Sequence, residues 1–265
     1  MPFDVLLLDI EGTITSISFV KDVLFKYVRD NLIDYLTKHW DDEELIRDAK
    51  AIIDQAALDE SDNSNIPQTT RTMVSPTANQ NCRSALDDGK FKERASLEEL
   101  AKIIFNWMDV DRKIGALKHF QGHMLSDAYQ SGILKGHLYP DVEPVLQKFH
   151  QRNIRIFIYS SGSVAAQKLL FKHSVCGDIT SIISGYFDTT IGAKIDHLSY
   201  VRIAKEVGTS PNKILFFTDV EAEAVAALSA DMQCILVERP GNRELTEEAR
   251  NRTKVIKSLD NLLLT

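Results

Sequence analysis

Polar side chains suited to phosphate chemistry follow three short apolar runs of the sequence. The runs are 5–8, 154–159 and 214–218, and the polar residues after them are Asp9 and Glu11, Ser160 and Ser161, and Asp219. In open α/β sheets, ligands bind at the carboxyl ends of the strands. A single Asp after a strand is often only a turn or cap residue. Three such ends in one chain, with Lys194 between the last two, predict a shared site.

The residue types in this set would hold a phosphate beside a divalent cation. Its three carboxylates offer the oxygen ligands that Mg²⁺ prefers. Its two serines, with the N–H groups that begin the next helix, can bind an anion, and Lys194 would add a positive charge. A carboxylate beside a metal and a phosphate is the setting for a nucleophile that forms an aspartyl-phosphate.

The elements that position these residues alternate between strands and helices. Strands are predicted at 5–8, 154–159, 214–218 and 234–237, and helices at 164–172 and 221–230. Such alternation is typical of a parallel sheet with right-handed crossovers. We therefore predict an α/β fold, with a Rossmann-like parallel sheet core that residues 1–18 and 140–265 form together.

A helical segment, residues 19–139, is predicted to interrupt this core after its first strand. Apolar residues recur there at helical spacing, and the predicted helices span 19–38, 42–58, 96–108 and 112–131. The third of them opens with Ser96-Leu-Glu-Glu99, the pattern of a capping box. Polar residues dominate 61–82, so we expect an exposed loop over residues 61–95.

Charge and composition narrow the class of partner. The chain has 31 Lys and Arg against 38 Asp and Glu, a formal net charge of −7. This negative charge argues against nucleic acid or an anionic membrane surface as a binding partner. Nine acids against two bases in residues 41–62 account for this excess, so an anionic substrate elsewhere is not excluded.

Cysteine usage and apolar runs indicate where the protein is located. The three cysteines form no CxxC motif, and no apolar run approaches the roughly 18 residues of a membrane span. The first residues lack the basic region of a signal peptide. We expect a cytoplasmic protein.

The motifs resemble those of a known family. Asp9-Ile-Glu-Gly-Thr13, Tyr159-Ser-Ser-Gly-Ser163, Phe187-Asp188 with Lys194, and Phe217-Thr-Asp219 look, in this order, like the four motifs of haloacid dehalogenase-like phosphatases. Glu11 in the first motif, the run 160–171 and Arg239-Pro-Gly-Asn242 are similar to the enolase-phosphatase (acireductone synthase) branch of methionine salvage. Asp111-Arg-Lys113 and Gln121-Gly122 resemble the helical cap of that branch, whereas Ile14 and Leu125 depart from its usual residues.

The resemblance implies a Mg²⁺-dependent phosphatase with a helical cap domain that also enolises its substrate. The implied substrate is 2,3-diketo-5-methylthiopentyl-1-phosphate, and the implied product is acireductone. By motif, Asp9 is the nucleophile, Glu11 is the second catalytic residue, and Asp219 joins both as a metal ligand, while Ser160, Ser161 and Lys194 bind substrate. The family also implies a monomer, located in the cytoplasm and in some members the nucleus.

Two other functions stay open at this point. The chain could be a haloacid dehalogenase-like phosphatase or phosphomutase that acts on a sugar phosphate. It could also be a catalytically silent scaffold, although such proteins usually lack one of the motif residues that this chain retains.

Two further signals are weaker. His119 and His123 lie four apart on a predicted helix, a spacing that can bind zinc, but Phe120 stands where HExxH has Glu and the sequence shows no third ligand. An ordinary helix surface is therefore the expectation for this pair. Glu223, four residues after Asp219, either contacts a group that ligates the metal or faces solvent.

Overall fold

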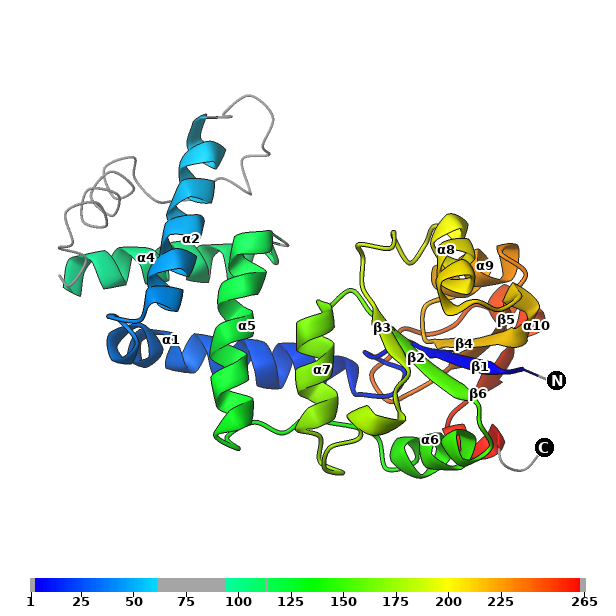
Figure 1. The fold of residues 1–265 in the computed structure, drawn as a ribbon. Helices are drawn as coiled ribbons and strands as arrows, with labels where there is room; N and C mark the ends of the chain where they lie inside the picture. Colours follow the sequence, from blue (N-terminus) through cyan, green and yellow to red (C-terminus); the bar gives the residue numbers. More distant parts are fainter. Residues whose placement is uncertain (1–2, 62–93, 113, 263–265) are drawn as a thin grey trace. The chain divides into compact units, whose positions relative to one another are not determined.

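The computed structural model describes residues 3–61, 94–112 and 114–262 (Figure 1). The chain divides into two compact units. One unit comprises residues 1–23 and 128–265, and the other comprises residues 24–127. The predicted insert contains the second unit, and its role as a cap stays a prediction.

A six-stranded parallel sheet forms the centre of the first unit. In spatial order the strands are β3 (Gly185–Phe187), β2 (Arg155–Tyr159), β1 (Val5–Leu8), β4 (Ile214–Thr218), β5 (Gln233–Val237) and β6 (Lys254–Ile256). The fully buried β1 pairs with both β2 and β4. Parallel sheets are covered on both faces and need apolar strands, which is why short apolar runs identify them in sequence. The predicted α/β class with a parallel core sheet is confirmed.

Helices connect the strands of this unit and cover the sheet. They are α6 (Val142–Gln151), α7 (Val164–Lys172), α8 (His197–Val207), α9 (Glu221–Ser229) and α10 (Glu247–Arg252), with short 3₁₀ turns at Thr180–Ile182, Pro211–Lys213 and Leu259–Leu262. Tyr200 of α8 and Ala227 of α9 belong to one buried cluster with Val5, Leu7 and Phe216 of the central strands. This packing anchors the two helices that border the candidate site.

The second unit is helical in the residues that the structure describes. A π-helical segment, Phe19–Phe25, leads along the chain into α1 (Lys26–Lys38), and α2 (Glu43–Ser61), α4 (Arg94–Asp109) and α5 (Gly115–Gln130) follow. Helix α4 packs against α1 and α2. Among the described helices, none is long and apolar enough to cross a membrane.

The predicted start of α4 at Ser96 is wrong. This helix already includes Arg94, so Ser96 lies in its first turn and does not cap it. Ser96 is buried, so this turn of α4 packs inside the helical unit. The loop predicted over 61–95 is helical at Ser61 and Arg94, and the rest of that prediction, residues 62–93, lies outside the described part of the chain.

Candidate active site

Asp9 and Asp219 follow two neighbouring strands, β1 and β4. Leu8 pairs with Phe217, and the N–H of Asp9 donates to the carbonyl of Phe217 over 2.9 Å. The two carboxylates therefore emerge at the same edge of the sheet. Both residues are buried, with 4% and 9% of their surface exposed.

The loop after β1 passes directly over Asp219. Gly12 has a φ of +75°, and a Cβ at that position would lie 2.3 Å from Oδ2 of Asp219. Only glycine allows both this backbone conformation and this close approach. The N–H of Gly12 donates to the carbonyl of Thr15 over 2.9 Å and closes a tight turn just after the half-buried Glu11.

Side chains from the segment after β5 hold the same loop. Asn242 Nδ2 donates to the carbonyl of Gly12 over 2.8 Å, and Arg239 Nε donates to the carbonyl of Thr13 over 3.1 Å. Arg239 is buried and also binds both carboxylate oxygens of Asp141, at 3.0 and 2.7 Å. These contacts fix the backbone of the loop that carries the candidate nucleophile.

Lys194 binds two of the acidic groups in the site. Its Nζ lies 2.5 Å from Oδ1 of Asp9 and 2.8 Å from Oε2 of Glu223. Thr218 donates its hydroxyl to the same Glu223 oxygen over 2.7 Å. Glu223 is buried, so the solvent-facing alternative considered for it is wrong. Its observed partner is the lysine, and the sequence offered no sign of this contact or of the role of Thr218.

The backbone around Lys194 is fixed by hydrogen bonds. Tyr200 donates its hydroxyl to the carbonyl of Lys194 over 2.7 Å, and Tyr159 donates to the carbonyl of Gly192 over 2.9 Å. Gly192 has a φ of +140°, and a Cβ there would lie 2.1 Å from Oγ of Ser199. Packing of α8 against this turn therefore requires the glycine, and it sets the position from which the lysine reaches the sheet edge.

The serine motif lies at the end of β2, the strand next to β1. Ser160 is buried, and its N–H donates to the carbonyl of Phe187 over 3.2 Å, whereas Ser161 is exposed. Ser163 caps α7 by accepting from the N–H of Ala166 over 3.2 Å. The structure thus places both predicted serines just before a capped helix N-terminus, where backbone N–H groups favour anions.

Burial and mutual repulsion control the protonation of the acidic groups. The pKa of Asp219 is raised to about 7, first by burial and then by the negative charge of Asp9. Burial and Asp9 also raise the pKa of Glu223, although Lys194 opposes this. Burial alone would lower the pKa of Lys194, but Asp9 and Glu223 outweigh it and raise that pKa. Three acidic side chains, Asp9, Asp219 and Glu223, therefore share one ammonium group, which contacts only Asp9 and Glu223 among them.

A Mg²⁺ ion fits this excess of acidic groups. Asp9 and Asp219 are buried oxygen donors at one edge of the sheet, and such hard ligands suit Mg²⁺. While Lys194 binds Oδ1 of Asp9, Oδ2 lies 3.5 Å from the hydroxyl of Thr13. Within the described residues, Asp9, Glu11 and Asp219 do not bring one side-chain ligand atom each within 4.8 Å of the others. Glu11 as the third metal ligand stays a prediction.

Comparisons with known proteins agree on one family. A family model described as haloacid dehalogenase-like hydrolase matches residues 3–231. The chain is 43% identical to an enolase-phosphatase E1 of Danio rerio, over 98% of this chain and 94% of the relative. It is 46% identical to an enolase-phosphatase E1 of Caenorhabditis briggsae, over 98% and 97%. The crystal structure of the UTR4 protein of Saccharomyces cerevisiae is similar with a TM-score of 0.68 and 29% identity, over 97% of this chain and 99% of that chain.

Proposed function

Because the chain belongs to the haloacid dehalogenase-like hydrolases, we propose that it is an enolase-phosphatase, as its relatives are named, and that it depends on Mg²⁺. The observation that carries the proposal is the contact of 2.5 Å between Lys194 Nζ and Asp9 Oδ1, beside the buried Asp219. A nucleophilic carboxylate must approach an anionic phosphate, and this lysine lowers the repulsion between them.

The proposed substrate is 2,3-diketo-5-methylthiopentyl-1-phosphate. Oδ2 of Asp9 attacks phosphorus while the bond from phosphorus to the ester oxygen breaks, and Glu11 gives a proton to the leaving oxygen. Water then attacks the phosphorus of the aspartyl-phosphate and gives a proton back to Glu11. Inorganic phosphate leaves, and the Asp9 carboxylate is restored. When bound, Mg²⁺ held by Asp9 and Asp219 supplies positive charge to the phosphoryl oxygens.

Substrate binding is proposed to rest on the serine motif and the lysine. Ser160 and Ser161 precede the N-terminus of α7 and would bind phosphate oxygens with its N–H groups. Lys194 would bind the same phosphate as a point charge. We expect a small phosphate ester as the only partner of a monomer that works in the cytoplasm, and by family in the nucleus, without nucleic acid or membrane.

The enolase half of the reaction is proposed to precede hydrolysis. Removal of a proton beside a ketone gives an enolate, whose oxygen needs a positive partner. Glu11 is the proposed base, and the proton that it takes from carbon is the one that it later gives to the leaving ester oxygen. The proton that water gives back to Glu11 then passes to the enolate oxygen, which restores the Glu11 carboxylate. Hydrolysis of the phosphate ester after this step gives acireductone, the product implied by the family resemblance.

A panel of phosphate esters tests the proposal against its rivals. The purified protein with Mg²⁺ is incubated with the diketone phosphate and with several hexose phosphates, and free phosphate and organic products are followed by mass spectrometry. We expect acireductone and phosphate from the diketone phosphate. Faster turnover of a hexose phosphate would make the protein a sugar phosphatase or mutase, and no turnover of any ester would favour the silent scaffold.

A further inference from the structure

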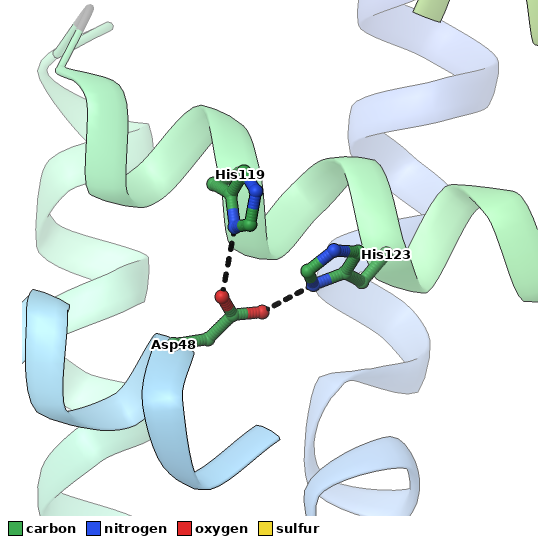
Figure 2. A group of neighbouring side chains, drawn as sticks. All are labelled: Asp48, His119 and His123. Atoms are coloured by element: carbon green, nitrogen blue, oxygen red, sulfur yellow. Dashed lines mark hydrogen bonds and ion pairs between the residues drawn. The ribbon is translucent and has the colours of Figure 1, made fainter. Parts of the chain in front are cut away.

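Three potential metal ligands converge in the helical unit, on helices α2 and α5. Asp48 of α2 lies between His119 and His123 of α5, as Figure 2 shows. Its Oδ1 is 2.9 Å from Nδ1 of His119, and its Oδ2 is 2.6 Å from Nδ1 of His123. The sequence suggested the pair of histidines but offered no third ligand, because that ligand lies 71 residues away along the chain. We propose that these three residues bind one divalent transition-metal ion, with Zn²⁺ as the preferred ion.

The spacing of the ligand atoms is close to what zinc requires. One atom from each of the three side chains lies within 4.8 Å of the other two. In a tetrahedral site with zinc–ligand distances of about 2.0–2.1 Å, neighbouring ligand atoms are roughly 3.3 Å apart. From the observed contacts of 2.9 and 2.6 Å, the carboxylate and the two rings would move apart by roughly 0.4–0.7 Å to accept the ion. A histidine pair at i and i+4 on one helix already fixes two ligands on one face.

The surroundings of His123 add a second, independent argument. Its Nδ1 faces Asp48, while its Nε2 lies 3.1 Å from Oε1 of Glu44. A neutral imidazole has a single N–H and can donate to only one of these carboxylates. When Nε2–H donates to Glu44, the lone pair of Nδ1 is directed toward Asp48, so the ring nitrogen and the carboxylate can both ligate one cation. Metal-bound histidines usually donate their second N–H to a carboxylate in this way.

Burial and ligand type select the class of ion. Asp48 has 5% of its side chain exposed, whereas His119 has 71% exposed, so an ion can enter from solvent and keep a water molecule as its fourth ligand. Imidazole nitrogens favour Zn²⁺, Co²⁺ and Ni²⁺ over Mg²⁺, which prefers oxygen. The bound ion would connect α2 to α5 and stabilise the helical unit. It is separate from the carboxylate site of the sheet unit, which is built from other residues.

Metal uptake tests the proposal on the full-length protein. Metal-free protein is loaded with excess Mg²⁺ to occupy the carboxylate site of the sheet unit, and Zn²⁺ is added in calorimetry at neutral pH. A parallel titration with Co²⁺ follows the visible absorption of the ion. We expect one equivalent of each ion to bind, with a Co²⁺ spectrum of nitrogen and oxygen ligands, and Zn²⁺ to raise the melting temperature.

Matched variants locate the site. His119→Gln changes the most exposed of the three ligands, and we expect it to lose the uptake of one equivalent and the rise in melting temperature. Asp48→Asn should do the same, and Glu44→Gln should weaken binding at least about tenfold, as expected for loss of a carboxylate behind a ligating histidine. His150→Gln, an exposed histidine on α6, is the control and should bind as the wild type does. No uptake by the wild type, or unchanged uptake by His119→Gln, would overturn the proposal.

Discussion

Arg239 binds both carboxylate oxygens of Asp141 and at the same time donates from Nε to the carbonyl of Thr13. One buried guanidinium thus connects the segment after β5, the start of α6 and the loop after β1. Only the planar fork of arginine can make the bidentate contact and the third bond together. The candidate nucleophile lies four residues before Thr13, so this contact holds the backbone of the loop that follows the nucleophile.

Arg239→Ala should destabilise the sheet unit by about 3–5 kcal/mol, the cost of leaving a buried partner charge uncompensated. Burial raises the pKa of Asp141, but the hydrogen bonds from Arg239 and from the N–H of Leu259 outweigh it and hold that pKa below its ordinary value. The stabilisation is therefore present at neutral pH and is lost as the pH falls through the lowered pKa. Urea unfolding at neutral pH and at a pH below the lowered pKa should show a smaller effect of the variant in acid. Arg252→Ala, which breaks an exposed pair with Glu248, is the control and should change stability little at either pH.

Asp9→Asn should abolish phosphate release even with saturating Mg²⁺, because an amide cannot form the aspartyl-phosphate. Uncatalysed hydrolysis of phosphate monoesters is so slow that no background rate should be visible; accelerations by enzymes reach about 10²¹. Asp4→Asn, at the opposite end of β1, should release phosphate at the wild-type rate. Substantial phosphate release by Asp9→Asn in a malachite green assay would remove Asp9 from its proposed role.

Lys194→Ala should lower kcat/KM by an amount equivalent to about 2–4 kcal/mol of transition-state stabilisation. It should also lower the melting temperature of the metal-free protein, because Asp9 and Glu223 lose the ammonium group between them. Added Mg²⁺ should recover part of that stability. Lys205→Ala, on the exposed side of α8, should leave both quantities unchanged. A variant with normal kcat/KM would show that the lysine is structural.

Mg²⁺ should bind more tightly as the pH rises toward 7. The pKa of Asp219 is raised to about 7 by burial and by Asp9, so a proton occupies this carboxyl below neutral pH and must leave when the ion binds. Affinity for Mg²⁺, measured by calorimetry, should rise up to about tenfold per pH unit below 7 and level off above it.

The same shift predicts the pH dependence of stability without metal. The folded state holds the Asp219 proton more tightly than the unfolded chain, so this group makes unfolding easier as the pH rises from about 4 to 7. Asp219→Asn should remove the contribution of this group from the pH dependence of urea unfolding, while the contribution of Glu223, whose pKa is also raised, remains. A difference in stability between the variant and the metal-free wild type that stays constant over this interval would contradict the raised pKa of Asp219.

The fold was readable from the sequence wherever a strand is buried on both faces. The runs at Val5–Leu8 and Ile214–Thr218 end at the predicted residues, since burial demands uninterrupted apolar side chains. Strands β3 and β6 have three residues each, only partly buried, and gave no such pattern. Short edge strands take their conformation from the neighbour with which they pair, which local sequence does not specify.

The sequence also predicted those residues of the candidate site that follow strands, but not the contacts that helices make with them. Asp9 and Asp219 could be placed together because adjacent parallel strands end at one edge of the sheet. The partner of Lys194 could not, because Glu223 reaches it from a helix whose rotation depends on packing across the whole cluster. The contact of Asp48 with two histidines of α5 is hidden for the same reason.

Glu11 is the proposed base that removes the proton during enolisation. Glu11 lies two residues after Asp9, at the turn that Gly12 closes, and its side chain is one methylene longer than that of an Asp. That extra length would let one carboxylate serve both a carbon acid and a leaving oxygen. General-base assistance is typically worth about 10²–10⁴-fold. Asp9→Asn should therefore still exchange the acidic C–H of the substrate with D₂O, while Glu11→Gln should lose that exchange by a factor in this range.

Mass spectrometry of the recovered substrate measures the exchange directly. Mg²⁺ occupancy has to be equal in the two variants, so both are examined at Mg²⁺ concentrations that calorimetry shows to be saturating. Under those conditions the comparison separates the two halves of the reaction, because Asp9→Asn blocks only the transfer of phosphorus. Exchange that persists in the metal-loaded Glu11→Gln protein would place the base on another residue, and the proposed dual role of Glu11 would be wrong.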